Sequence, residues 1–360
     1  MRVTIDAVPL LVRSAGVKNY LYYWTRYLRQ ESHGVDIRLF PFLGDASSLD
    51  HEGSIANPVT TLARLGMLFF LNRIPNNAAQ WMSPGTDVFH TCKVLYPPRR
   101  ARLTATIHDL TCWILPETHF AINIAADKHF ADRILRRADG LIAVSEATRA
   151  DAVRILNLPP EKIHVIHHGV TDAYFQATPT AAAKPYLLCV GTIEPRKNID
   201  RLLDAYAALA PSLREQFDLV IAGPPGWAHS TTMERLRHPP PGVRYLGYVA
   251  EHELPGLFAG ATAFVYPSLY EGFGFPVAQA MAAGVPVITS GVSALPEIAG
   301  GAAVLIDPLS AGEIRDAIAN LLTSPSRRAE LSALGRVNAR RFSWTENARK
   351  SLRFFEEVAG

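Results

Sequence analysis

The sequence lacks the cysteine pattern of a disulfide framework or of a metal centre. Its cysteines, Cys92, Cys112 and Cys189, stand far apart along 360 residues. Such isolated cysteines are typical of buried thiols in a reducing compartment. The sequence also has no Asp-x-Asp pair, and no histidine, cysteine and carboxylate residues at the spacing of metal ligands. We therefore expect no bound metal.

Long apolar runs and a strong net charge are absent as well. No stretch of about 18 consecutive apolar residues could form a membrane-spanning helix, and residues 1–6 read as a strand rather than as a leader segment. The formal net charge of +3 is too small to indicate nucleic acid as a partner. The apolar segment 65–71, flanked by Arg64 and Arg73, fits a core-facing helix or a contact with an anionic membrane surface. We expect a cytoplasmic protein, with peripheral contact at the inner face of the membrane as an open alternative.

A dinucleotide-binding fingerprint is missing too. Neither half of the chain has Gly-x-Gly-x-x-Gly after its first apolar run, and the pair Gly272 and Gly274 lacks the third glycine. The fingerprint needs all three glycines to bring a pyrophosphate to the helix N-terminus. A redox enzyme that uses a dinucleotide is therefore disfavoured, and we expect no cofactor.

The chain does contain two series of short apolar runs that alternate with helical patterns. With 48% apolar and 19% charged residues, 360 residues suffice for two domains. Alternation of this kind predicts α/β domains with doubly wound parallel sheets, and ligands of such sheets bind at the carboxyl ends of the strands. We expect two facing Rossmann-like domains with a cleft between them. The runs are 3–8, 36–40, 87–90, 104–108, 141–145 and 163–167 in the first half, and 186–191, 219–223, 243–246, 263–267, 285–289 and 303–306 in the second.

The stretch 178–185 separates the two series. It is rich in alanine and bounded by prolines, which suits an exposed linker. We predict a first domain over 1–175, a second over 185–340 and a final helix over 343–360.

The most informative segment runs from Ser268 to Val287. Glu271 stands on a turn with Gly272 and Gly274, and a helix of small residues follows near Pro276. Glycines let backbone amides approach a ligand closely, and the helix N-terminus favours an anion. The sequence predicts a phosphate-and-sugar site, with Gln279 inside the helix facing the same ligand.

A second polar segment, Glu194-Pro195-Arg196-Lys197-Asn198, follows the first strand of the second half. Arginine can bind phosphate oxygens through two parallel hydrogen bonds, and lysine acts as a mobile point charge. Such cations suit a diphosphate, but an arginine–lysine pair taken alone is more often merely solvated, so the residues by themselves leave both interpretations open.

Together these segments resemble the donor-binding motifs of the GT4 family of retaining glycosyltransferases, which have the GT-B fold. The resemblance implies that the second domain holds a nucleotide-sugar donor, that the first meets the acceptor, and that the final helix crosses back to the first domain. It also implies that His108, at the end of a strand, lies at the donor sugar. The implied catalytic residues are Glu271, His108, Arg196 and Lys197; the implied donor-binding residues are Gly16, Thr192, Arg196, Lys197, Val249, Glu271, Gly272, Phe273, Gly274 and Gln279.

The chain departs from the family pattern at Gln279, where the motif has a second glutamate separated from the first by seven residues. Glutamine keeps an acceptor but loses the charge. The resemblance implies a retaining, metal-independent transfer of a hexose from a nucleoside diphosphate sugar, GDP-mannose being favoured over a uridine donor, to a hydroxyl of a glycan or lipid-linked acceptor. Two alternatives stay open: a nucleotide-sugar-binding protein with a degenerate site, and a nucleotide-sugar epimerase of the same fold.

Overall fold

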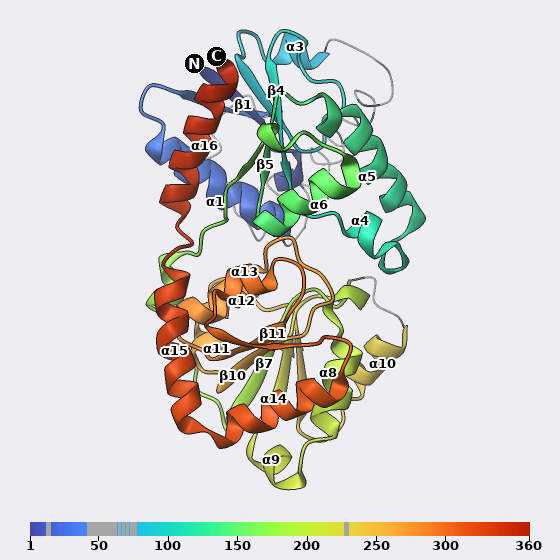
Figure 1. The fold of residues 1–360 in the computed structure, drawn as a ribbon, viewed down its shortest axis with the longest axis vertical. Helices are drawn as coiled ribbons and strands as arrows, with labels where there is room; N and C mark the ends of the chain where they lie inside the picture. Colours follow the sequence, from blue (N-terminus) through green and yellow to red (C-terminus); the bar gives the residue numbers. More distant parts are fainter. Residues whose placement is uncertain are drawn as a thin grey trace. The chain divides into compact units, whose positions relative to one another are not determined.

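The structure is a computed structural model that describes residues 1–11, 16–41, 63, 66, 69, 72, 78–226 and 230–360. The chain forms two compact units, each with a parallel sheet and helices (Figure 1). The first unit comprises Met1–Gly169 and Trp344–Gly360, and the second comprises Val170–Ser343. Most of the segment 65–71 lies outside the described residues. Among those described, no helix combines the length and the apolar character needed to cross a membrane.

The first unit is built on a sheet with the strand order β2-β1-β3-β4-β5-β6, in which all pairs are parallel. Strands covered on both faces are expected to be continuously apolar, and β3 and β5 are buried at every position. The strands are β1 Arg2–Asp6, β2 Asp36–Phe40, β3 Val88–Thr91, β4 Arg102–Ile107, β5 Gly140–Ala143 and β6 Ile163–Val165. The helices are α1 Gly16–Glu31, α3 Ala78–Met82, α4 Thr111–Ile114, α5 Ala121–Arg133, α6 Glu146–Leu156 and α16 Trp344–Ala359, with 3-10 turns at Val8–Leu11, Pro116–Thr118, Leu135–Arg137 and Pro160–Lys162.

The second unit repeats the architecture with the order β12-β11-β10-β7-β8-β9, again parallel throughout. Two six-stranded parallel sheets confirm the predicted α/β class. The strands are β7 Tyr186–Val190, β8 Asp218–Ala222, β9 Val243–Gly247, β10 Ala263–Tyr266, β11 Val287–Ser290 and β12 Ala303–Ile306. The helices are α7 Asp172–Phe175, α8 Ile199–Ala207, α9 Pro211–Gln216, α10 Ser230–Arg237, α11 Leu254–Ala259, α12 Phe275–Ala282, α13 Leu295–Ala299, α14 Ala311–Thr323 and α15 Pro325–Ala339, with a 3-10 turn at Pro195–Lys197.

The last helix, α16, packs in the first unit beside α1, although the rest of the chain lies between them in sequence (Figure 1). The indole nitrogen of Trp24 on α1 donates to Ser351 Oγ on α16 at 2.9 Å. Asn347 Nδ2 donates to the backbone oxygen of His167 at 2.7 Å. The side chains of Phe354 and Phe355 are buried there, so α16 completes the apolar core of this unit.

The chain passes from the first unit to the second between Gly169 and Val170, earlier than the expected boundary at 178–185. The Val170 N–H already donates to Phe342 O at 2.9 Å within the second unit. Inside the expected linker, the Thr180 N–H donates to Gly256 O at 3.0 Å. The proline-bounded stretch is therefore anchored to the second unit by a hydrogen bond, a long-range contact that its composition does not reveal.

Candidate active site

The glycine-rich segment forms the connection between β10 and α12. Gly274 adopts a left-handed conformation with φ of 100° and precedes the first residue of α12. A side chain at this position would be strained, and its Cβ would lie 2.8 Å from Leu295 Cδ2. Pro276 stands in the first turn of α12, where its missing N–H costs no hydrogen bond. Glycine and proline here thus serve to start a helix sharply after the strand.

The arginine–lysine segment forms the corresponding connection after β7, the neighbour of β10 in the sheet. Because the strands are parallel, the two connections leave the same edge. They are also joined directly: the Leu269 N–H donates to Arg196 O at 2.8 Å, and Asn198 Nδ2 donates to Pro267 O at 3.0 Å. The backbone therefore holds the two motifs next to each other.

Both cations are paired with the same carboxylate. Lys197 Nζ lies 2.6 Å from Glu271 Oε1, and Arg196 Nη1 lies 2.6 Å from Glu271 Oε2. The hydroxyls of Ser268 and Tyr266 donate to Oε1 at 2.6 and 2.8 Å. Arg196 Nη2 also lies 2.5 Å from Glu194 Oε1. We refer to Glu194, Arg196, Lys197, Tyr266, Ser268 and Glu271 as the ion cluster.

Burial makes these charge interactions strong. The side chains of Glu271, Lys197 and Arg196 are 9%, 10% and 15% exposed. Burial alone would raise the pKa of Glu271, but the charges of Arg196 and Lys197 lower that pKa to about 2. Burial and Arg196 lower the pKa of Lys197, and Glu271 opposes that shift. Glu271 thus stays ionised, and its charge favours the protonated form of Lys197.

The cluster can supply positive charge to a bound anion from a pre-formed position. The ammonium of Lys197 has three donors, and within the described part of the chain its hydrogen bonds go to Tyr266 and Glu271. One N–H is left for a ligand. The chemistry suits stabilisation of charge that develops on a phosphate leaving group.

The other predicted residues of the second unit lie at the same edge of its sheet. Thr192 follows β7 and Val249 follows β9, and both are half-buried. Gly272 and Phe273 are buried beside Glu271. Phe273 packs its ring against Phe342, with centroids 5.4 Å apart, so a packing role accounts for this side chain.

Gln279 lies on α12 and is half-buried. Within the described ranges its amide makes no hydrogen bond with another residue, in contrast to the fully engaged carboxylate of Glu271. The structure therefore places Glu271 and the two cations together and leaves Gln279 outside their hydrogen-bond network.

His108 and Gly16 belong to the first unit. His108 directly follows β4 and is half-buried, and Tyr20 contacts its ring edge-on with centroids 4.9 Å apart. Burial lowers the pKa of His108 to about 4, so its imidazole is neutral near pH 7. Gly16 begins α1 and is exposed; the residues before it in its loop, 12–15, lie outside the described residues.

Sequence reasoning missed a hydrogen-bonded group behind His108. His90 is fully buried; its Nδ1 and Nε2 each lie 3.0 Å from a threonine hydroxyl, those of Thr104 and Thr106. Thr106 Oγ1 lies 3.2 Å from the hydroxyl of Tyr20. The sequence signal that could have revealed this group is a polar residue within an otherwise apolar strand. Tyr266, a hydroxyl-bearing residue at the end of an apolar strand, could have been found in the same way.

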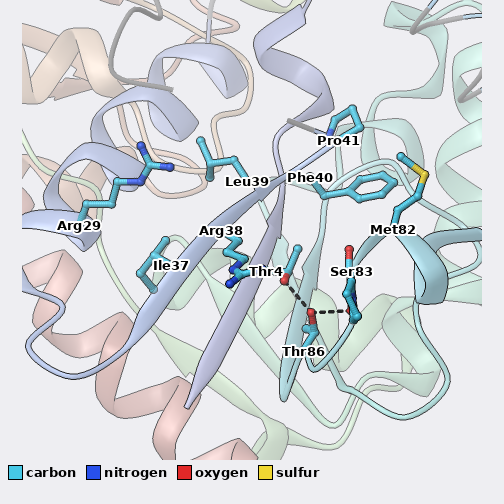
Figure 2. A pocket seen from close by; sticks show the side chains of 11 residues that line it. Thr4, Arg29, Ile37, Arg38, Leu39, Phe40, Pro41, Met82, Ser83 and Thr86 are labelled. Carbon is cyan, nitrogen blue, oxygen red and sulfur yellow. Dashed lines mark hydrogen bonds between the residues drawn. The ribbon is translucent and has the colours of Figure 1, made fainter. Parts of the chain in front are cut away.

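A separate hollow of about 270 Å³ lies in the first unit beside strand β2 (Figure 2). Thr4 and Thr86 hydrogen-bond each other at 2.8 Å, and the Thr86 hydroxyl donates to Ser83 O at 3.0 Å. None of the residues predicted for the site lines this hollow. It holds neither a predicted site residue nor a member of the ion cluster, so we assign it no role in the chemistry.

Metal ligands are not grouped in the part of the chain that the structure describes: no three histidine, cysteine, aspartate or glutamate side chains come together there in a suitable arrangement. The ion cluster places two cations and two carboxylates at the carboxyl edge of the second sheet.

Comparison with known proteins identifies the family. Residues 170–337 match the model for glycosyl transferases group 1, and residues 14–174 match that for glycosyltransferase family 4. O-antigen chain mannosyltransferase B of Escherichia coli is 34% identical over 269 residues, which cover 71% of this chain and 71% of that protein. The serotype-specific mannosyltransferase WbdA of the same species is 26% identical over 240 residues, covering 62% of this chain and 29% of its own length.

Solved structures show the same architecture. Sucrose-phosphate synthase from Thermosynechococcus elongatus superposes with a TM-score of 0.74 at 20% identity, over 99% of this chain and 99% of that one. Identity at this level establishes the fold alone, and the fold agrees with the two parallel sheets described above. The chain therefore belongs to the GT4-like glycosyltransferases, with the GT-B fold and a group 1 glycosyl transferase segment that contains the ion cluster.

Proposed function

We propose that the protein is a retaining, metal-independent glycosyltransferase that transfers a hexose from a nucleoside diphosphate sugar to a hydroxyl of a glycan or lipid-linked acceptor. The ion cluster carries this proposal. Arg196 and Lys197 are held at the carboxyl edge of the second sheet by Glu271 and by the backbone hydrogen bonds between their two loops. A diphosphate bound there would meet both positive charges without the help of an ion.

In the proposed reaction, the bond between the anomeric carbon and the diphosphate oxygen breaks, and the acceptor oxygen bonds to that carbon on the same face. The proton of the acceptor hydroxyl passes to the departing phosphate. The negative charge that grows on the leaving group is stabilised by Lys197 and Arg196. His108, neutral near pH 7, would hydrogen-bond a hydroxyl of the donor sugar.

GDP-mannose is the donor that we favour. Support comes from the sequence resemblance and from two relatives whose names describe mannosyltransferases. A uridine donor is the competing choice, because a base contacted by backbone groups near Val249 would leave no mark in the side chains. Thermal-shift measurements with GDP, UDP and ADP distinguish a guanosine donor from a uridine donor, since a ligand that binds the native state raises the melting temperature of the protein.

The test of the proposal has two parts. A shift with one nucleoside diphosphate in the absence of divalent metal is the expected first result, followed by hexose transfer that persists in EDTA. Absence of a shift with all three would contradict the donor site. Reversible loss of transfer on chelation would contradict metal independence.

Two alternatives give different results. A binding protein with a degenerate site should gain transfer strongly when Gln279→Glu restores the family carboxylate, whereas our proposal expects a change of less than about threefold, under about 1 kcal/mol. An epimerase should convert the donor sugar when no acceptor is present. We also propose peripheral contact with an anionic membrane surface, which absence of co-sedimentation with anionic vesicles would contradict.

A further inference from the structure

Tyr266 is a buried tyrosine at the end of β10, only 1% exposed, whose hydroxyl lies inside the ion cluster. We propose that Tyr266 is a positioning residue that directs the ammonium of Lys197 toward the donor diphosphate. This inference rests on the proposed function, because it assigns to Lys197 a diphosphate ligand.

The geometry fixes the direction of each hydrogen bond. The Tyr266 hydroxyl lies 2.5 Å from Lys197 Nζ and 2.8 Å from Glu271 Oε1. An ammonium group can only donate and an ionised carboxylate can only accept. Lys197 therefore donates to the tyrosine oxygen, and the tyrosine O–H donates to Glu271.

These contacts remove the rotational freedom of the ammonium. Lysine has a flexible four-carbon stem with three rotatable donors. Tyr266 and Glu271 accept two of the three N–H groups, and in a tetrahedral group two fixed directions determine the third. The stem is also confined by burial, since Lys197 is only 8% exposed. The remaining N–H thus has a defined orientation before any ligand binds.

Tyr266 itself is fixed by its strand and by packing, so its hydroxyl has a defined position. It lies on β10, which pairs with β11 and β7. Its carbonyl accepts from Thr289 Oγ1 at 3.0 Å. Its ring stacks on Phe264 with centroids 5.7 Å apart. Loss of the hydroxyl alone would leave this packing in place.

The test replaces Tyr266 by phenylalanine, which keeps the ring and the net charge of the cluster. Tyr186→Phe is the matched control, because Tyr186 lies on neighbouring β7 and its hydroxyl donates to the backbone of Leu257 instead. Calorimetry measures the binding of GDP and of GMP at a temperature below the melting transitions of all variants. If the donor base is uridine, UDP and UMP replace them.

The expected result for Tyr266→Phe is an affinity for the diphosphate reduced about tenfold, with less than about threefold change for the monophosphate, in line with the loss of one hydrogen bond to a charged group. kcat should fall as well. Tyr186→Phe should match the unaltered protein for both ligands. An unchanged diphosphate affinity in Tyr266→Phe, or an equal loss for both ligands, would overturn the inference.

Ser268→Ala provides a second comparison within the cluster. It removes a donor to the same oxygen of Glu271 but no contact with Lys197. We expect it to reduce diphosphate affinity less than Tyr266→Phe does. An equal loss would mean that the orientation of Glu271, rather than of Lys197, carries the effect, and would contradict the proposal.

Lys197→Ala separates failure of this inference from failure of the proposed function. If the unaltered protein binds no nucleoside diphosphate, the proposed function fails. If it binds one, and Lys197→Ala weakens that binding while Tyr266→Phe does not, only the role of Tyr266 is refuted.

Discussion

Lys197 Nζ lies 2.6 Å from Glu271 Oε1, although 74 residues separate the two in sequence. The carboxylate that the sequence placed in a phosphate-and-sugar site is therefore a counter-ion of both cations. A donor diphosphate would enter a site whose positive charges are already neutralised from within. Pairing with Glu271 should therefore affect both the stability of the protein and its binding of a diphosphate.

We predict that Glu271→Gln lowers the melting temperature of the ligand-free protein and enlarges the shift produced by a nucleoside diphosphate. Removal of one partner leaves buried cations uncompensated, which typically costs about 3–5 kcal/mol, and a bound diphosphate would restore the balance of charge. Differential scanning fluorimetry with and without the ligand measures both effects. Glu215→Gln, at an exposed site of the same unit, is the control, and equal shifts in the two variants would refute the prediction.

We predict that Glu271→Ala and Lys197→Ala each reduce hexose transfer at least about tenfold, about 1.4 kcal/mol of transition-state stabilisation. Both changes dismantle the charged group that would stabilise the leaving diphosphate. Initial rates at saturating donor and acceptor measure the loss. Lys184→Ala, which removes an ion pair with Asp218 elsewhere in the same unit, should retain nearly full activity. Near-normal rates in both cluster variants would remove these residues from the proposed mechanism.

The stabilising effect of Glu271 should disappear in acid. Its pKa in the folded protein is about 2 against 4.5 for the free group. A lowered carboxylate pKa contributes stability above the unfolded value, and this contribution is lost as the pH falls from 4.5 toward 2. The unfolding free energies of the unaltered protein and Glu271→Gln, measured with urea, should differ most above pH 4.5 and converge as the pH falls toward 2. If the difference in unfolding free energy between the two proteins stays constant with pH, the charge of Glu271 is not the source of that difference.

His90 should make the stability of the first unit depend on pH over a higher pH range than Glu271 does in the second unit. Burial, with a smaller contribution from His108, lowers its pKa from 6.5 to about 3. The unfolded chain then binds a proton that the folded chain excludes, so stability falls as the pH drops from 6.5 toward 3.

His90→Gln should remove this contribution. The unfolding free energy would then depend less steeply on pH, by up to about 1.4 kcal/mol per pH unit. Chemical unfolding at several pH values measures the slope. His252→Gln, at an exposed position, should leave the slope unchanged, and an unaltered slope in His90→Gln would contradict the prediction.

The C-terminal helix should be essential for the stability of the first unit. Phe355 on α16 is fully buried, and truncation of such a phenylalanine typically costs about 3–5 kcal/mol. Phe355→Ala should lower the free energy of unfolding by that amount, whereas Glu356→Ala at the adjacent exposed position should change it by less than about 0.5 kcal/mol. Urea unfolding measures the free energy of unfolding of both variants. Equal values would show that Phe355 does not contribute to the core of the first unit.

The sequence predicted the elements of both sheets because their inner strands are buried on both faces and therefore appear as continuous apolar runs. Each expected run overlaps a strand of the structure. Local turn chemistry likewise placed Gly274 and Pro276 at the start of α12. The position of the first boundary was not predictable in this way, since the hydrogen bond from Val170 to Phe342 joins residues far apart in the chain.

The sequence by itself determined the class of fold, the family and the two loops of the candidate site, because strand burial, glycine turns and short motifs are local properties. Only the tertiary structure decided that Glu271 pairs with both Arg196 and Lys197 and that Tyr266 joins them. The physical reason is the order of strands: β10 lies beside β7, with β8 and β9 on the far side of β7. Side chains that leave the same edge of a sheet meet regardless of their separation in the chain, and no local pattern encodes that adjacency.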